Sequence, residues 1–369
     1  MVAGALARSL AKAGLAVTWV SSNASPQPAD VPSLRLVSSN LIERLCGLPF
    51  PLPGPISLAR LCNVIRANDA VLVHDGMYPS NIAAIIVAHL LRRPVVLVQH
   101  IGRVPATSVV LRALFAIADR ALTRPMLRLA SQVVYISSTS ARHFSGVVTR
   151  REPKLIFNGV DTTIFRPSAT EDGRSKEREQ LGWPTRRPVL LFVGRFLEKK
   201  GLQRLREMSI RRPDFHWAFA GWGPCDPECW NHHNVTVHRG LSGAKLASLY
   251  RSADCLVLPS KSEGYPLVVQ EALACGLRAI CCDDAAGGDP DAAVNITGIT
   301  NAGSEREIVD QYLAEIDMLV NVPQPDAGRY ERARFARERY SWDSAAEQYL
   351  AIFQSLTDEM VAAEKRATA

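Results

Sequence analysis

The sequence predicts an α/β protein built from two doubly wound domains, and three observations support this prediction. The chain has 369 residues, which is long for a single domain. Short valine-rich runs alternate with helical patterns in two successive series, and a polar interval separates the two series. Apolar residues make up 47% of the chain and charged residues 21%, so each domain has enough apolar residues to bury a core.

The first domain is expected over residues 1–150. Helical patterns at 81–92 and 109–122 lie between strand-like runs that are apolar almost throughout. Continuously apolar strands separated by helices are typical of a parallel sheet that is covered on both faces. The expected strands of this domain are 17–22, 34–39, 70–75, 94–100 and 131–138.

The start of this domain departs from the usual order of strand, Gly-rich turn and helix. The first residues are already helical in pattern, and Gly14 is the expected C-cap before a strand that begins at Val17. Either the start codon is assigned too far downstream, or the domain lacks its first strand. We expect in-frame coding sequence upstream of Met1 to encode a strand and a Gly-rich turn.

Residues 151–188 are polar and rich in turn-forming residues, so we expect them to connect the domains. The second domain is expected over 189–340, and residues 341–369 are expected to form a C-terminal helix that packs back on the N-terminal domain. Two Rossmann-like domains of this kind would face each other across a cleft. The expected strands of the second domain are 189–194, 216–221, 235–240, 255–260 and 278–283.

Charge is distributed unevenly along the chain. Residues 1–150 contain 15 Lys and Arg against 5 Asp and Glu, whereas the whole chain has a net charge of +7. A basic first half indicates an anionic partner, either a phosphorylated acceptor or the headgroup face of a membrane, with a solvated basic surface as an equally open interpretation. One helix carries basic residues at multiples of four, which predicts a basic face that solvent, acceptor or membrane would cover. These residues are Arg112, Arg120, Arg124 and Arg128.

The location expected for the chain is cytoplasmic, with peripheral contact at the inner face of the membrane as a further expectation. No run of 18 apolar residues is free of charge, so we expect no transmembrane helix. Half of the eight cysteines lie in apolar runs, which is typical of reduced core thiols. We expect no nucleic-acid partner.

Polar residues follow the expected strands of the second domain, at the edge where open α/β sheets bind ligands. Arg195 and Lys200 follow the first strand, where they could converge on a diphosphate. Glu263 precedes a helix that begins near Pro266, and the free N–H groups of that helix would face an anion. Glu271 lies about one turn into the helix, within reach of ribose hydroxyls, and Glu263 can accept from sugar hydroxyls. A basic surface turn and an ordinary solvated helix are the alternatives.

Five motifs in this order resemble the retaining glycosyltransferases of family 4, which have the GT-B fold. Each motif is weak alone, but five in register are specific for the family, though not for its substrate. The resemblance is strong over roughly residues 130 to 285. The motifs are FNGVDTTIFRP (157–167), FVGRFLEKKG (192–201), AGWGP (220–224), LYRSADCLVLPS (249–260) and SEGYPLVVQEALACG (262–276).

The resemblance implies a role for each matching residue. Arg195 and Lys200 match the pair that binds the diphosphate of the donor, and Glu263 matches the acid near the transferred sugar. Glu271 matches the acid on the nucleotide ribose, and His100 matches a histidine that faces the donor sugar. His100, Glu263, Arg195 and Lys200 are therefore the expected catalytic set.

The remaining donor-binding residues act through their backbone. The resemblance assigns the amides of Gly264, Tyr265 and Leu267 to phosphate or sugar oxygens, and the glycines allow the nucleotide to approach the main chain. His74 and Asp75 are further candidates in the first domain. The glycines of this set are Gly194, Gly221, Gly223 and Gly264.

The resemblance implies transfer of a sugar from a nucleotide-diphosphate sugar to an acceptor hydroxyl, as in cell-envelope or exopolysaccharide glycan synthesis. We identify no Asp-x-Asp motif that would hold a catalytic divalent ion, so we expect neither metal nor cofactor. The C-x3-C-x2-H-H run from Cys225 to His233 is an alternative zinc motif. Two other functions stay open: a catalytically inactive GT-B partner subunit and a GT-B sugar-nucleotide epimerase. The sequence does not specify the donor base, the sugar or the acceptor.

Overall fold

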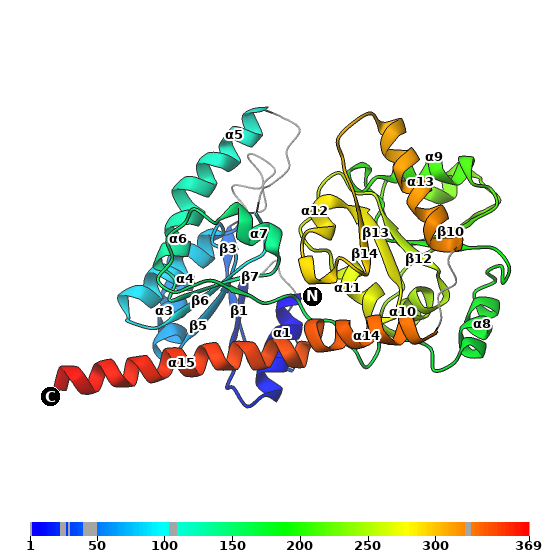
Figure 1. Ribbon diagram of the computed structural model, residues 1–369. Helices are drawn as coiled ribbons and strands as arrows, with labels where there is room; N and C mark the ends of the chain where they lie inside the picture. The colour runs from blue at the N-terminus through cyan, green and yellow to red at the C-terminus, as the bar shows by residue number, and fades with distance from the viewer. Residues whose placement is uncertain are drawn as a thin grey trace. The chain divides into compact units, whose positions relative to one another are not determined.

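The computed structural model of the chain consists of two compact units (Figure 1). The first unit comprises Met1–Gly159 and Trp342–Ala369, and the second comprises Val160–Ser341. Each unit contains a parallel sheet with helices packed on it, which confirms the predicted α/β class and the two Rossmann-like domains. The structure describes residues 2–22, 27–28, 30–39, 50–102, 109–321 and 326–368.

The strands of the first unit form three sheets. Four parallel strands pair in the order β5-β6-β7-β8, a second parallel pair joins β1 to β2, and β3 pairs with β4 in antiparallel fashion. The strands are β1 (Trp19–Ser22), β2 (Ser33–Leu36), β3 (Ser38–Ser39), β4 (Leu52–Pro53), β5 (Val71–His74), β6 (Val95–Gln99), β7 (Gln132–Tyr135) and β8 (Lys154–Leu155).

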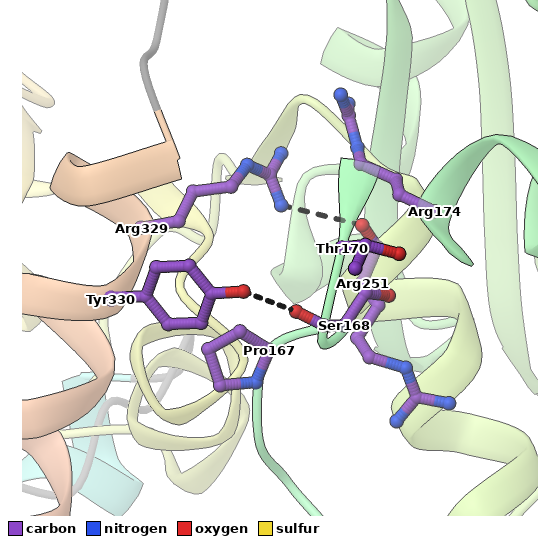
Figure 2. A pocket seen from close by; sticks show the side chains of 7 residues that line it. All are labelled: Pro167, Ser168, Thr170, Arg174, Arg251, Arg329 and Tyr330. Carbon is purple, nitrogen blue, oxygen red and sulfur yellow. Dashed lines mark hydrogen bonds between the residues drawn. The ribbon is translucent and has the colours of Figure 1, made fainter. Parts of the chain in front are cut away.

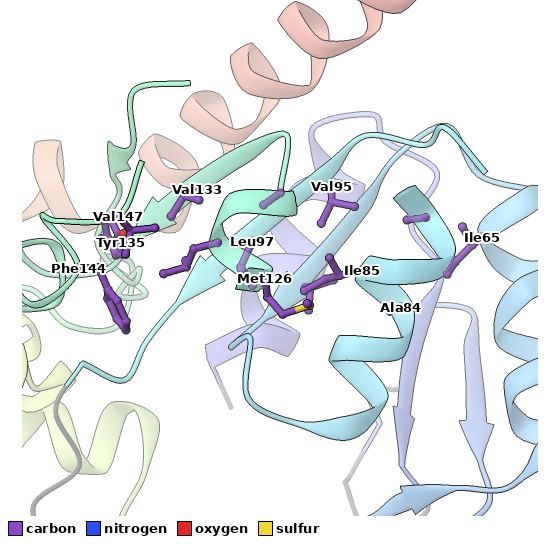
Figure 3. Packing of buried hydrophobic residues seen from close by; sticks show 14 of the residues in the cluster. Ile65, Ala84, Ile85, Val95, Leu97, Met126, Val133, Tyr135, Phe144 and Val147 are labelled. Atoms are coloured by element: carbon purple, nitrogen blue, oxygen red, sulfur yellow. The ribbon is translucent and has the colours of Figure 1, made fainter. Parts of the chain in front are cut away.

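Strand β6 shows why this unit needs helices on both faces of its sheet. Successive side chains of a strand point to opposite faces, so Leu97 packs on one side, with Ile85 and Met126 (Figure 3), and Val96 and Val98 pack on the other. The helices of the unit are α1 (Val2–Lys12), α3 (Pro55–Arg66), α4 (Pro79–Leu90), α5 (Val109–Ala118), α6 (Arg124–Leu129), α7 (Ser138–His143) and α15 (Trp342–Thr368), with a π-helical turn at Asp119–Thr123 between α5 and α6.

The C-terminal helix α15 belongs to the first unit. Its residues Tyr349 and Ile352 are buried together with Leu6 and Leu10 of α1, against the face of the sheet that carries Val96. The helix therefore completes the core on that face. The C-terminal helix expected over 341–369 is thus present, and it begins at Trp342.

The second unit has one six-stranded parallel sheet in the order β11-β10-β9-β12-β13-β14. The five expected strands are present, and the sixth, β14, was missed because its four residues contain a Gly and a Thr. The strands are β9 (Val189–Arg195), β10 (His216–Trp222), β11 (Val235–His238), β12 (Cys255–Leu258), β13 (Arg278–Cys282) and β14 (Ile296–Ile299).

Part of the interval 151–188 is helical rather than loop. Helix α8 (Glu171–Gln180) uses Arg174 and Arg178 to bind the carboxylate of Asp254, which explains the polar composition of this helix.

The other helices of the second unit are α9 (Leu202–Arg211), α10 (Gly243–Ser252), α11 (Leu267–Ala274), α12 (Asp283–Ala286), α13 (Glu305–Asn321) and α14 (Asp326–Tyr340). Short 3-10 turns lie at Glu198–Lys200, Pro227–Trp230 and Pro290–Ala292.

Among the described residues, none of the helices combines the length and the apolar composition that crossing a bilayer demands.

Candidate functional site

The strand order of the second unit locates its ligand-binding edge. The chain forms β9 first, adds β10 and β11 on one side, and then crosses to add β12 on the other side. In such a sheet the crevice opens at the carboxyl ends of the two strands where the order reverses. Here these strands are β9 and β12, which lead directly into Arg195 and into the segment that contains Glu263.

Gly201 brings these two segments together. Its φ is +80°, and a Cβ at this position would lie 2.1 Å from the carbonyl oxygen of Pro259, so only glycine fits. The N–H of Lys261 also donates to the carbonyl of Lys199 at 2.9 Å. This close packing of two main chains places Lys200 beside Glu263, and the two side chains form an ion pair.

Arg195 lies at the same edge, at the end of β9. Its side chain is exposed, and in the described ranges it has no recorded ion pair. The neighbouring strand β10 has Gly221 as its penultimate residue, and Gly223 follows the strand. A Cβ would lie 1.9 Å from the carbonyl oxygen of Gly194 at Gly221 and 2.4 Å from that of Phe196 at Gly223. These glycines therefore keep two strand ends in close contact, a packing role that the resemblance did not supply.

Helix α11 starts at this edge without a side-chain cap. Pro266 is its N-cap residue and provides no side-chain cap. The N–H of Val269 donates to the carbonyl of Pro266 at 3.1 Å, so the N–H groups of Leu267 and Val268 are the ones of the first turn that can meet an anion. Gly264, just before the helix, is exposed, as it must be if its main-chain amide is to contact a ligand. The predicted helix start is thus confirmed.

Glu271 lies one turn into α11 and has a partner that the sequence interpretation missed. The hydroxyl of Tyr250, which is fully buried, donates to Oε2 of Glu271 at 2.8 Å. Burial raises the pKa of Glu271 to about 7, and the Tyr250 hydrogen bond partly opposes this rise. Tyr250 is the second residue of the motif LYRSADCLVLPS, so the motif already included it, but only the fold places it against Glu271.

Tyr265 points away from the exposed edge. Its hydroxyl donates to the hydroxyl of Tyr340 at 2.8 Å, and Tyr340 in turn donates to Asp289 at 2.5 Å. The side chain of Tyr265 therefore anchors its segment, and only its amide remains for a ligand. Asp289 and Asp291 have the spacing Asp-x-Asp, which the sequence interpretation overlooked, and Arg339 binds both carboxylates.

The first unit places two imidazoles together at the carboxyl ends of β5 and β6. Nδ1 of His74 lies 2.8 Å from Nε2 of His100, and the ring centroids are 5.0 Å apart. Parallel pairing of β5 with β6 produces this contact, because both residues stand at the ends of adjacent strands. The contact occupies Nε2 of His100 and leaves its Nδ1 as the ring nitrogen that can meet a ligand.

Asp75 holds the main chain at His100. Its Oδ1 accepts hydrogen bonds from the N–H groups of His100 at 2.9 Å and of Ile101 at 3.2 Å. Asp75 has a φ of +66°, and Asn81 stabilises this turn by donating to the carbonyls of His74 and Asp75. Asp75, a candidate from the sequence, is therefore a structural residue that orients His100.

The electrostatics keep both imidazoles neutral. Burial, with a smaller contribution from the adjacent His100, lowers the pKa of His74 to about 3. Burial also lowers the pKa of His100, although the carboxylate of Asp75 acts in the opposite direction. A neutral pair shares one proton across its contact, so the state of His74 determines whether Nδ1 of His100 donates or accepts.

The zinc motif does not form a cluster. His232 binds the hydroxyl of Ser209 through Nδ1 at 2.9 Å, and no group of three or more His, Cys, Asp or Glu among the described residues is arranged to hold a metal.

A small hollow of the second unit (Figure 2) lies away from the candidate site. It is next to the end of α10, which precedes β12, and so lies at the opposite edge of the sheet from Glu263. Arg329 donates to main-chain carbonyls and Tyr330 donates to the carbonyl of Ser168 at 2.9 Å, so its polar groups serve the packing of α14.

The structure thus brings some predicted residues together. Lys200 contacts Glu263, and the two lie with Arg195, Gly221 and the first turn of α11 along one edge of the second unit. His100 belongs to the first unit, where it contacts His74 instead.

Two family models match the chain. The model described as "Glycosyltransferase Family 4" matches residues 1–164, and that described as "Glycosyl transferases group 1" matches residues 173–299. Residues 165–172, near the start of the second unit, separate the two matches, which together account for most of the chain.

Curated and solved proteins agree with these models. A D-inositol 3-phosphate glycosyltransferase of Xylanimonas cellulosilytica is 30% identical over 218 residues, which are 54% of this chain and 50% of that protein. The matched region thus spans about half the length of this relative.

The fold of the chain is similar to that of sucrose-phosphate synthase from Thermosynechococcus elongatus, with a TM-score of 0.67 and 18% identity over 96% of this chain and 92% of that chain. HepE of Anabaena, solved in complex with UDP-glucose, has a TM-score of 0.60 and 18% identity over 88% of this chain and 86% of that chain. The strand order and the likenesses to solved structures show the fold, which is GT-B. The two family models together show that the chain belongs to the family 4 type of glycosyltransferases.

Proposed function

We propose that this chain is a retaining glycosyltransferase that moves a sugar from a nucleotide-diphosphate sugar to an acceptor hydroxyl. The observation that carries the proposal is the ligand-binding edge of the second unit. A cation, Lys200, stands beside the carboxylate of Glu263, near the uncapped first turn of α11. The same edge offers Arg195 as a second cation.

This arrangement suits a leaving nucleoside diphosphate. Negative charge develops on the diphosphate as the glycosidic bond breaks, and Lys200, Arg195 and the α11 amides stabilise it. We therefore propose that the reaction needs no divalent metal. Retention of configuration is part of the proposal on the strength of the family, in which the departing phosphate helps to deprotonate the acceptor.

Glu271 and His100 complete the proposed roles. Glu271, in its ionised form, accepts hydrogen bonds from the ribose hydroxyls, and Tyr250 holds one of its oxygens in place. His100 keeps its role as the residue that faces the donor sugar, with Nδ1 as the contacting atom.

The acceptor belongs to cell-envelope or exopolysaccharide glycan synthesis in this proposal, as a sugar or a lipid-linked glycan. The basic first half of the chain supports an anionic acceptor or a membrane surface. A cytoplasmic location, peripheral on the inner membrane face, belongs to the same proposal.

Calorimetric titration of the full chain with UDP, GDP, ADP and TDP, each with and without EDTA, tests the donor site. We expect one nucleotide to bind selectively, with unchanged affinity in EDTA and weaker affinity in Glu271→Ala. Binding of none of the four would favour the inactive partner subunit instead.

Activity and stereochemistry require a second measurement. Incubation of the matching nucleotide sugar with glycan acceptors, followed by NMR of the anomeric proton, should show transfer with retained configuration. Conversion of the nucleotide sugar to its epimer without acceptor would favour the epimerase, and inverted configuration would contradict the retaining mechanism.

A further inference from the structure

Helix α5 of the first unit differs from the helices around it because it buries no residue. None of its ten residues is buried, whereas the comparable helix α4 buries Ala84, Ile85 and Ala88. Figure 1 shows α5 extending away from the strands of the unit. The helix nevertheless has the sequence VVLRALFAIA, in which a single residue is charged.

The exposed side of α5 is an apolar stripe. Val110, Leu114 and Ile117 are spaced at i, i+4 and i+7, so they lie on one face of the helix, and they are 69%, 55% and 62% exposed. The other side, with Leu111 and Phe115, is half-buried. The helix thus has one apolar side in contact with the protein and a second that contacts nothing in the described structure.

The charges beside the stripe are basic. Arg112 and Arg120 are exposed. The acidic residue Asp119, just after α5, forms an ion pair with Arg124, with 3.1 Å between Oδ2 of Asp119 and Nε of Arg124. The four arginines therefore do not form the single basic face expected from their spacing, because Arg124 is turned toward Asp119. By helical spacing Arg112 lies at the edge of the exposed side opposite the stripe, across Val109 and Ala113, and Arg120 follows the helix at its C-terminal end. Within the described residues, the exposed side of α5 is therefore apolar, with arginines at its borders.

These charges select one kind of partner. An anionic bilayer surface offers hydrocarbon for the stripe and phosphate groups for the arginines, whose long stems can reach the headgroup level. A symmetric contact between two copies would instead oppose one basic helix with another. The first 150 residues add to this preference, with 15 Lys and Arg against 5 Asp and Glu.

We propose that Val110, Leu114 and Ile117 of α5 insert into the interfacial layer of a bilayer that contains anionic phospholipid, with Arg112 and Arg120 at the phosphate level. This inference rests on the peripheral membrane contact in the proposed function and names the residues that make it. No residue of the nucleotide site takes part, so loss of vesicle binding and loss of nucleotide binding can be told apart.

Vesicle flotation with the full chain tests the proposal. Wild type should float with vesicles of phosphatidylcholine and phosphatidylglycerol and much less with phosphatidylcholine alone. The triple substitution Val110→Ser, Leu114→Ser and Ile117→Ser should weaken partitioning on the order of a hundredfold, since it removes most of the apolar area that the bilayer would bury. Arg112→Gln with Arg120→Gln should remove the preference for the anionic lipid.

The matched control is Leu90→Ser with Val148→Ser, two apolar residues of the same unit that are 74% and 82% exposed but lie outside α5. This variant should float like wild type. All variants should keep the wild-type thermal unfolding midpoint, because the changed side chains are exposed.

Three results would overturn the proposal. One is equal flotation of the triple variant and wild type. Another is a wild-type dimer in light scattering that the triple variant converts to monomer while neither protein binds vesicles, which would assign the stripe to contact between copies. A wild type that stays in solution with both kinds of vesicle also rejects the bilayer as the partner.

Discussion

The two units hold their candidate groups in opposite electrostatic states. In the first unit, His74 and His100 form a contact between neutral imidazoles, because burial lowers the pKa of each. In the second unit, Lys200 and Glu263 form an ion pair whose side chains stay partly exposed at the sheet edge. This difference agrees with the proposed function, in which the second unit stabilises the charge of a diphosphate and the first unit supplies an uncharged hydrogen bond.

The largest expected effect concerns the Lys200–Glu263 ion pair of the second unit. Lys200→Ala removes the cation and leaves the carboxylate of Glu263 unpaired near the diphosphate, so nucleotide affinity should fall roughly tenfold to a hundredfold. Calorimetry with the preferred nucleoside diphosphate measures this. Lys199→Ala, which removes an exposed neighbouring cation, is the matched control and should bind almost as wild type does. Equal losses in both variants would mean that only general positive charge matters.

The second-largest expected effect is the pH dependence of nucleotide binding at Glu271. Because the pKa of Glu271 is raised to about 7, its carboxylate forms as the pH rises through that value, and nucleotide binding should be roughly tenfold stronger at pH 8 than at pH 6. Tyr250→Phe removes a hydrogen bond that lowers this pKa, so the midpoint should move to higher pH.

The predicted pH dependence is tested by measuring nucleotide affinity from pH 5.5 to 8.5 for the wild type, Tyr250→Phe and Glu271→Gln. Titration of the nucleotide phosphate is common to all three proteins, so differences between them report the carboxyl group. A profile for Tyr250→Phe that coincides with wild type would show that Tyr250 has only a packing role.

A smaller effect is expected for the contact between the neutral imidazoles of His74 and His100 in the first unit. His74→Asn removes the imidazole that shares a proton with His100, so the tautomer of His100 is no longer defined. We expect kcat to fall roughly fivefold while nucleotide affinity stays near wild type. The control is His89→Asn, an exposed histidine of the same unit. A wild-type kcat in His74→Asn would mean that His100 acts without its partner.

The smallest effect on the site should come from Tyr340. Tyr340→Phe breaks the chain of hydroxyls from Tyr265 to Asp289, and denaturant unfolding should show a loss of about 1–2 kcal/mol. Nucleotide affinity should change little, because Tyr265 offers the ligand only its amide. A large loss of affinity at unchanged stability would show that the Tyr265 segment depends on this chain for its position.

Much of the second unit was predictable because its signals are local. Strands β9 and β12 are continuous apolar runs, and the start of α11 follows from Pro266, so the positions of Arg195 and Glu263 at the strand ends could be expected. The short strand β14 and the helix α8 were missed, since neither has an apolar periodicity strong enough to identify it.

The partners of the site residues were not predictable in the same way. Tyr250 lies 21 residues before Glu271, and His74 lies 26 residues before His100. No local pattern links such pairs, because parallel strands and their crossover helices bring them together only in the folded unit.

The fold class, the strand ends that carry polar residues and the family could be predicted from the sequence, because strand periodicity, turn residues and motif order are properties of short segments. Which side chains meet, which of them burial leaves uncharged, and the apolar side of α5 that contacts nothing among the described residues became known only from the folded chain. These depend on solvent exclusion and on contacts between distant segments, which exist only once the chain has packed.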